Sequence, residues 1–229
     1  MATNVKYSAG KFEVFNPTRN SDSPIMPAAG KSVQILSQKF NVNKCSNYIR
    51  GKTFVFPLVL EHNYYHFHHN NMIRVYQSMV EAESETCAPN WYDQINATLN
   101  EQLYNKNISK DVHFVISGSY NNLNLFNSFY PLFSDYSYHT IDQIPENTCF
   151  EFAVIRDAEY GFWHKEGEGN PGDFRHLLIQ HYGDYVVKQY GLDHIAPPTS
   201  PHICIVQRTN NRKIQNLEAI SGNATLYRF

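Results

Sequence analysis

Residues 53–80 read TFVFPLVLEHNYYHFHHNNMIRVYQSMV, and this stretch decides the fold. Its first eight residues are a short run of β-forming apolar side chains, which predicts a buried strand. Pro57 within the run favours an edge position or a strand end. Apolar residues then recur at helical spacing, which predicts a helix over residues 65–82. A buried strand followed by an amphipathic helix is the basic unit of an α/β protein.

The alternation of strands and helices continues along the chain. Asn170 is a good N-cap with Pro171 at the first helical position, and Gly191 is a natural stop for the helix between them. The whole pattern predicts a doubly wound, Rossmann-like layer with a mainly parallel sheet. Further strands are predicted over residues 111–117, 149–156 and 202–207, and further helices over residues 91–104, 123–133 and 208–219.

Length, net charge and the lack of long apolar stretches narrow the class of protein further. The chain has 229 residues, enough for one large domain or one and a half small ones. Residues 1–50 are polar and contain several prolines, which predicts an irregular lead-in with one or two short strands. A net charge of −2 argues against nucleic acid or a membrane surface as a partner. No stretch has the length of a membrane span, and no signal peptide is visible.

Four cysteines are widely and irregularly spaced, at Cys45, Cys87, Cys149 and Cys204. The absence of a CxxC pair argues against a structural zinc or thioredoxin-type site. An even count permits two disulfides, in any of three pairings, without requiring one. Cys204 lies in an apolar run, where a buried free thiol is the ordinary expectation.

The predicted helix over residues 65–82 carries a polar row along the rim of its apolar face. This row consists of Asn63, His66, Asn70 and Arg74. Such a row suits a binding site, but its members equally suit helix capping or hydrogen bonds to the core.

A metal site is a further alternative for the same helix. His62 and His66 are four residues apart and His66 and His69 three apart, so two of them share a face. No acidic residue lies between residues 63 and 76, and no second Cys/His cluster is obvious, which disfavours zinc.

A second polar stretch follows the predicted strand over residues 202–207. Arg208, Arg212 and Lys213 would place positive charge at the carboxyl end of that strand, beside the start of a helix. Guanidinium groups and free backbone N–H groups together suit a diphosphate. A solvated surface cluster of basic residues remains the alternative.

The order of segments over residues 54–220 resembles glycosyltransferase family 61, above all its members that attach O-linked N-acetylglucosamine to EGF domains. The final motif, a strand ending in Arg before Arg-Lys-Ile-x-Asn, is the most specific. The matching residues in this sequence are Asn63 and His66 with Asn70, Phe133 with Asp135 and Tyr136, Cys149 with Phe150, Tyr160 to Trp163, Phe174 with Arg175, and Arg208 with Arg212, Lys213, Ile214, Asn216 and Glu218.

The resemblance implies one half of a GT-B-type glycosyltransferase and inverting transfer from a UDP-sugar. The donor would be UDP-N-acetylglucosamine, and the acceptor a Ser or Thr hydroxyl of a secreted or membrane glycoprotein, in the lumen of the endoplasmic reticulum or Golgi. No metal is expected. His66 is the candidate base, with Asn70 beside it, and the residues implied in substrate binding are Asn63, Arg175, Arg208, Arg212, Lys213 and Asn216.

Two departures from the family pattern keep the enzymatic status open. The position of a family Asp is Asn70 here, and a neutral amide does not accept a proton at neutral pH. The family also continues into a second Rossmann-like half with a His-Gly-Ala-Gly stretch, of which residues 201–229 would be the start, after a first domain over residues 51–200. We therefore expect a fragment or a degenerate copy with impaired activity. A non-catalytic binding module of the same fold, or an unrelated cytosolic α/β protein, are the alternatives.

Overall fold

The computed structural model describes residues 2–15, 26–28, 31–36, 41–83, 108–118, 120, 122–156 and 172–196. The chain divides into two units, Met1–Gly191 and Leu192–Phe229. All helices and strands given below belong to the first unit. Only residues 192–196 of the second unit are described, so the predicted second domain over residues 201–229 lies outside the described residues.

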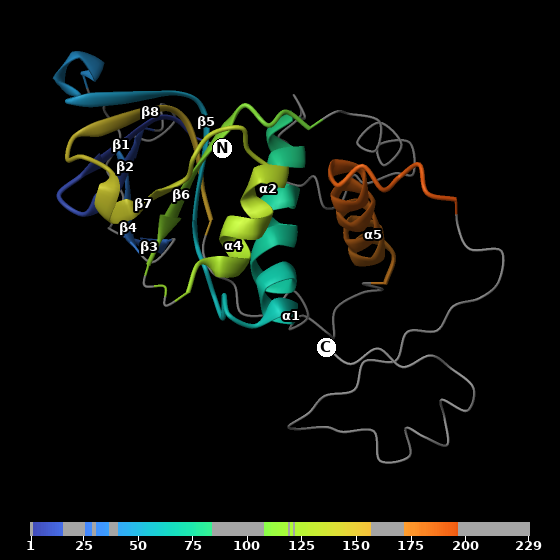
Figure 1. Ribbon diagram of the computed structural model, residues 1–229. Coiled ribbons are helices and arrows are strands. Elements are labelled where there is room, and N and C mark those ends of the chain that lie inside the picture. Colours follow the sequence, from blue (N-terminus) through green and yellow to red (C-terminus); the bar gives the residue numbers. More distant parts are fainter. Residues whose placement is uncertain are drawn as a thin grey trace. The chain divides into compact units, whose positions relative to one another are not determined.

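The described strands form one mixed sheet in the order β3-β4-β2-β1-β8-β5-β6-β7 (Figure 1). The ladders β8–β5, β5–β6 and β6–β7 are parallel, whereas β1 is antiparallel to both β8 and β2. The α/β prediction is confirmed, but parallel pairing prevails only in the half of the sheet that contains β5. The strands are β1 (Ala2–Ser8), β2 (Lys11–Phe15), β3 (Met26–Ala28), β4 (Lys31–Leu36), β5 (Asn47–Pro57), β6 (Val112–Ser117), β7 (His139–Thr140) and β8 (Thr148–Ile155).

Helices cover the parallel part of the sheet. α2 and α4 lie side by side on one face of the sheet (Figure 1). Their apolar side chains and those of β5 and β6 form one buried cluster that contains Phe56, Phe114 and Met79. The helical elements are η1 (Val42–Lys44), α1 (Tyr64–His66), η2 (Phe67–Met72), α2 (Ile73–Glu83), α4 (Asn124–Phe129), η4 (Tyr130–Leu132), η5 (Ile141–Gln143) and α5 (Gly172–Gln189).

Two further contacts complete this layer arrangement. The α5 ring of Tyr182 lies 5.8 Å from that of Tyr76 on α2, and the Tyr185 hydroxyl donates to the Leu132 carbonyl at 2.7 Å. A second buried cluster includes Val55 and Ile141, so η5 packs against the sheet residues that do not face α2.

The elements that carry strong sequence patterns form where they are predicted. Of the strand predicted over residues 53–60, residues 53–57 form the second half of β5; Pro57 is its last residue rather than a mark of an edge strand. The helix over residues 65–82 is the continuous run of α1, η2 and α2. Gly191 has a φ of 66° and its N–H donates to Lys188 O, as expected of a helix stop. The strands over residues 111–117 and 149–156 are β6 and β8, and the helix over residues 123–133 is α4 with η4.

The first fifty residues are more regular than the sequence predicts. Instead of one or two short strands they supply all of β1 to β4 and the first residues of β5. Val5 and Tyr7 of β1 are buried, while Lys6 between them lies 4.0 Å from the Glu13 carboxylate on β2. The prediction of an irregular lead-in is therefore wrong, because this segment extends the main sheet beyond β8.

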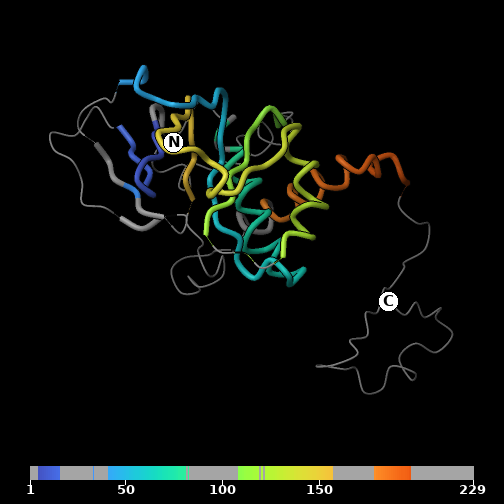
Figure 2. The backbone as a smooth tube through the Cα atoms, turned by 60° about the vertical axis from the view of Figure 1, so that its left-hand side comes forward, coloured from blue at the N-terminus to red at the C-terminus, as the bar shows by residue number. Residues whose placement is uncertain are grey.

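The amino ends of β5 and β8 are joined covalently. Cys45 and Cys149 form a disulfide, with Cα atoms 5.7 Å apart. Beyond it, β5 and β8 run side by side (Figure 2). Cys87 and Cys204 lie outside the described residues, as do the predicted helices over residues 91–104 and 208–219, the strand over residues 202–207 and the cap at Asn170. No helix within the described ranges is both long enough and apolar enough to cross a lipid bilayer.

Candidate functional site

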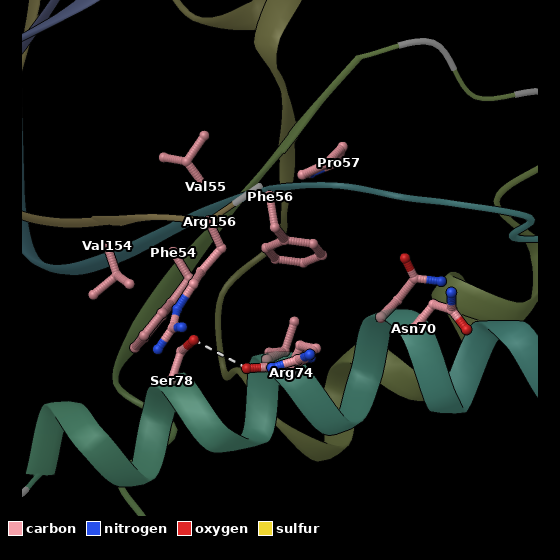
Figure 3. Close-up of a pocket in the computed structure, with 11 residues that line it drawn as sticks. Phe54, Val55, Phe56, Pro57, Asn70, Arg74, Ser78, Val154 and Arg156 are labelled. Atoms are coloured by element: carbon pink, nitrogen blue, oxygen red, sulfur yellow. Dashed lines mark hydrogen bonds between the residues drawn. The ribbon is translucent and has the colours of Figure 1, made fainter. Parts of the chain in front are cut away.

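A small pocket, with a cavity volume of about 20 Å³, lies between the helix run and the carboxyl ends of β5 and β8 (Figure 3). Residues 54–57 of β5 and Val154 of β8 form its apolar part. The polar part comes from the helix run and from the residue that follows β8. Its polar residues are Asn70, Asn71, Arg74, Ser78 and Arg156.

The position of the pocket follows from the strand order. After β5 the chain adds β6 and then β7 on one side, and it returns with β8 to the other side of β5. Ligands of open α/β sheets bind outside the carboxyl ends of strands at the point where the order reverses. The pocket lies at that point, because β5 and β8 are the parallel neighbours between which the order reverses.

Arg156 is the polar residue that the sheet itself supplies. Its N–H donates to Val55 O at 2.9 Å, which continues the β5–β8 ladder by one residue. Figure 3 shows the Arg156 side chain reaching from the strand side toward Ser78 on the helix. The β-ladder therefore fixes the backbone position from which the Arg156 side chain extends.

Asn63 starts the helix run by capping it. Its Oδ1 accepts the N–H groups of Tyr65 and His66, at 3.1 and 3.4 Å. This satisfies two donors that a helix start leaves without partners. Of the polar row predicted from sequence, Asn63 therefore fits the capping alternative, and it does not line the pocket.

The helix widens into a π-helix at η2, and this turn carries Asn70 and Asn71. π-turns inside α-helices are frequent at functional sites. Asn71 is 3% exposed and binds the Val59 backbone twice, accepting its N–H and donating to its carbonyl, each at 2.9 Å. This pair of bonds fastens the segment after β5 to the helix beside the pocket.

Two histidines meet the Asn70 side chain. The Nδ1 atoms of His66 and His69 each lie 3.3 Å from its Oδ1. Burial lowers the pKa of His69; the bond to Asn70 opposes this effect, while Arg74 and His66 add to it. The ring of His69 also stacks on that of Tyr65, at 5.1 Å between centroids. Asn70 therefore lies between the pocket and a pair of imidazoles.

Charge in the pocket is positive. Arg74 and Arg156 both line it, and among the described lining residues there is no carboxylate. The Arg74 Nη1 donates to Gln77 at 3.3 Å, and the Ser78 hydroxyl donates to the Arg74 carbonyl at 2.9 Å, the dashed line of Figure 3. A guanidinium group has five N–H donors, so it can hold a protein neighbour and a ligand oxygen at once. The arrangement suits a phosphate or carboxylate.

No family model, curated protein or solved structure matches the chain significantly.

Zinc is not favoured by this geometry. His66 and His69 turn Nδ1 toward an amide oxygen, and His62 is exposed. Within the described ranges there is no group of three or more His, Cys, Asp or Glu side chains that could hold a metal.

Three of the polar residues predicted along the helix rim lie at or beside the pocket. Asn70 and Arg74 line the pocket, and His66 binds Asn70. Sequence reasoning missed Arg156 and Ser78 as site residues. Arg156 ends a predicted strand, as Arg208 does, and that shared position was the available signal. The Arg175 side chain lies outside the described residues, as do Arg208, Arg212, Lys213 and Asn216.

Proposed function

We propose that this chain is a glycosyltransferase of the family 61 type that binds the diphosphate of a UDP-sugar in the pocket between β5, β8 and α2. The donor is UDP-N-acetylglucosamine, and the acceptor is a Ser or Thr hydroxyl of a glycoprotein with EGF-like domains. One observation carries the proposal. Arg74 and Arg156, from a helix and from a strand end, line one pocket at the carboxyl ends of parallel strands.

The strand order supports a nucleotide-binding half of the GT-B type. The parallel strands run β7-β6-β5-β8, which is the order of the first four strands in the doubly wound dinucleotide-binding fold. The neighbouring antiparallel β1 departs from that fold.

The disulfide supports a place of action in the endoplasmic reticulum or Golgi lumen. Disulfides form and persist in oxidising compartments and are rare in the cytosol. Cys45 and Cys149 are 104 residues apart in the chain and are bonded. This observation weighs against the alternative of an unrelated cytosolic protein.

The proposed reaction needs a base and a positively charged leaving-group site. The His66 Nε2 takes the proton of the acceptor hydroxyl, whose oxygen attacks the sugar C1 from the face opposite the diphosphate. The bond from C1 to the phosphate oxygen breaks, and its electron pair leaves with the UDP. Arg74 and Arg156 stabilise the charge that develops on the diphosphate, without a metal ion.

A non-catalytic binding module of the same fold is the second candidate. It is favoured by the absence of a carboxylate among the described lining residues and by the amide at Asn70, where the family pattern has an Asp. Such a module would bind the UDP-sugar or a glycoprotein without turnover.

Calorimetric titration of the chain with UDP and UDP-N-acetylglucosamine tests the proposal. Arg156→Ala removes a charged hydrogen-bond donor worth about 1.5–3 kcal/mol, so the affinity should fall roughly 10- to 100-fold. Arg50→Ala is the matched control, because it removes the same charge from an exposed residue near the other end of β5. Its affinity should equal that of the wild type.

Two outcomes are decisive. Lack of UDP binding by the wild type, or equal losses in Arg156→Ala and Arg50→Ala, would overturn the assignment of this pocket. Incubation with UDP-N-acetylglucosamine and a folded EGF module then separates the two candidates. Transfer of the sugar supports the enzyme, and tight UDP binding without transfer supports the binding module.

A further inference from the structure

The Asn70 side chain offers its two ends to different neighbours. Its Oδ1 lies 3.3 Å from the Nδ1 of His66 and 3.3 Å from the Nδ1 of His69. An amide oxygen only accepts hydrogen bonds, so each of these Nδ1 atoms must carry a hydrogen. Both contacts therefore call for a hydrogen on Nδ1, which the neutral Nδ1–H tautomer and the imidazolium form both have.

The Asn70 side chain also lines the pocket. Oxygen and nitrogen diverge from the planar amide carbon, so an oxygen turned to the histidines leaves the NH₂ group turned away from them. Asn70 lines the pocket, and its Nδ2 donates to no described group. The amide of Asn71 is already bound to the Val59 backbone. Asn70 thus brings a neutral double donor to the pocket that Arg74 and Arg156 also line.

We propose that Asn70 is a positioning residue that couples the pocket to His66: its carbonyl oxygen holds His66 and His69 as Nδ1–H tautomers, while its NH₂ group donates to an oxyanion in the pocket. The inference rests on the proposed function only for the identity of the ligand as a nucleotide sugar. For the coupling itself, any phosphate-type oxyanion in the pocket is sufficient. Asn70 stands where the family pattern has an Asp. In this proposal the amide orients the base His66, so the difference does not mark the loss of a base.

The chemical consequence concerns His66. A neutral imidazole with its hydrogen on Nδ1 has its lone pair on Nε2, so Nε2 is the basic atom. An oxyanion that binds the Asn70 NH₂ group polarises the amide and strengthens the bonds that its oxygen accepts. Filling the pocket should therefore make His66 a stronger base. The stack of His69 on Tyr65 holds the second imidazole in place.

Nitrogen-15 NMR of the imidazole rings in the whole chain tests whether the Asn70 oxygen holds His66 and His69 as Nδ1–H tautomers. Both His66 and His69 should give the pattern of the Nδ1–H tautomer, and Asn70→Ala should convert them to a mixture. Asn70→Asp should keep the Nδ1–H form, because a carboxylate oxygen still accepts. An Nε2–H pattern in the wild type, or no change in Asn70→Ala, would overturn the proposal.

Titration with inorganic pyrophosphate tests whether the Asn70 NH₂ group donates to an oxyanion in the pocket. Asn70→Asp replaces the NH₂ donor by an anionic oxygen and should weaken binding more than 10-fold. Asn70→Ala removes a neutral donor only and should weaken it about 2- to 10-fold. Asn43→Asp, an identical change at an exposed site on η1, is the control and should leave binding unchanged.

Asn70→Asp should therefore keep the tautomer and lose most of the pyrophosphate affinity, whereas Asn70→Ala should lose the tautomer and only part of the affinity, a pattern that a general loss of structure does not produce. Far-UV circular dichroism and the backbone amide spectrum verify that each variant is folded. Pyrophosphate binding by Asn70→Asp at wild-type affinity contradicts the inference. If pyrophosphate gives the expected pattern but UDP-N-acetylglucosamine does not bind, the proposed function fails and the coupling through Asn70 stands.

Discussion

Strands β5 and β8 lie side by side, but their two ends carry different chemistry. At the amino ends the Cys45–Cys149 disulfide joins them, and the N–H of Ser46 donates to Asn147 O at 3.0 Å. Close by, the Glu151 carboxylate accepts the N–H of Gly51 at 2.7 Å. At the carboxyl ends there is instead a pocket whose apolar wall carries polar and cationic side chains along one side.

This difference places covalent and backbone bracing at one end of the strand pair and the side chains that could bind a ligand at the other. Covalent and backbone bonds at one end fix the strand pair, so the other end can present side chains in defined positions. Functional residues are commonly carried at the ends of such rigid elements. We therefore expect substitutions at the amino ends to change the free energy of unfolding and to leave the pocket intact.

Loss of the disulfide should have the largest effect. Bridges that close loops of about 100 residues stabilise by roughly 2–5 kcal/mol, and this one spans 104 residues. Cys45→Ala should lower the free energy of unfolding in urea by about that amount. Cys149 is buried, and Cys45→Ala leaves its side chain in place, so the loss reports the bond rather than packing. UDP affinity should stay within about twofold; a tenfold loss would break the separation between the two ends.

Asn71→Ala should give the next largest effect, at the pocket end. It leaves the N–H and the carbonyl of Val59 without their 2.9 Å partners, and each unsatisfied buried group costs about 1–3 kcal/mol. We expect a loss of roughly 2–4 kcal/mol in urea unfolding. Asn70→Ala is the matched control and should cost about 1 kcal/mol or less, because its bonds to the histidines are longer. Similar costs for both variants would show that Asn71 has no special structural role.

Much of the helix-covered half could be predicted because its signals are local. The apolar run in β5 and the helical spacing that follows it identify their elements without knowledge of partners. The polar row along that helix includes Asn70 and Arg74, and both line the pocket. Asn63 belonged to the same row, but capping and ligand binding use the same residue types, so the sequence left that choice open.

The rest depends on pairing between distant segments. β1 alternates Val5 and Tyr7 with Lys6, so it contains no apolar run to detect. It becomes a strand because it pairs with β8, with Val5 opposite Phe150. Arg156 was missed for a similar reason. Its place in the pocket depends on β8 returning beside β5, and no local pattern in the sequence encodes that return.

Gly51→Ala should have a smaller effect at the amino ends. Gly51 has a φ of 77° at the irregularity where β5 shifts register against β8. A Cβ there would meet nothing within 4 Å, so the expected cost of about 1–2 kcal/mol is conformational only. Gly183→Ala on α5 is the control, because its φ is not positive and it also has space. It should stabilise by about 0.5–1 kcal/mol, and destabilisation by both variants would contradict this account.

The smallest expected effect is a pH dependence that differs between the two ends. Burial lowers the pKa of His68, on η2, below its ordinary value of 6.5. Burial also lowers the pKa of His113, near the start of β6; there the Asp111 carboxylate opposes the effect and His139 adds to it. With a lowered pKa the folded chain binds fewer protons than the unfolded chain near pH 6.5. The free energy of unfolding should therefore fall as the pH falls through 6.5 toward the folded-state pKa.

Substitution by Gln removes each titration in turn. Urea unfolding at about pH 7.5 and about pH 5.5 gives the acid-induced loss of stability for each variant. His68→Gln should reduce that loss more than His113→Gln, because no carboxylate offsets the burial of His68. His69 and His181, whose pKa values burial also lowers, keep part of the dependence in both variants. A larger reduction in His113→Gln would contradict this expectation. It would mean that acid lowers the free energy of unfolding mainly through the amino end of the strands.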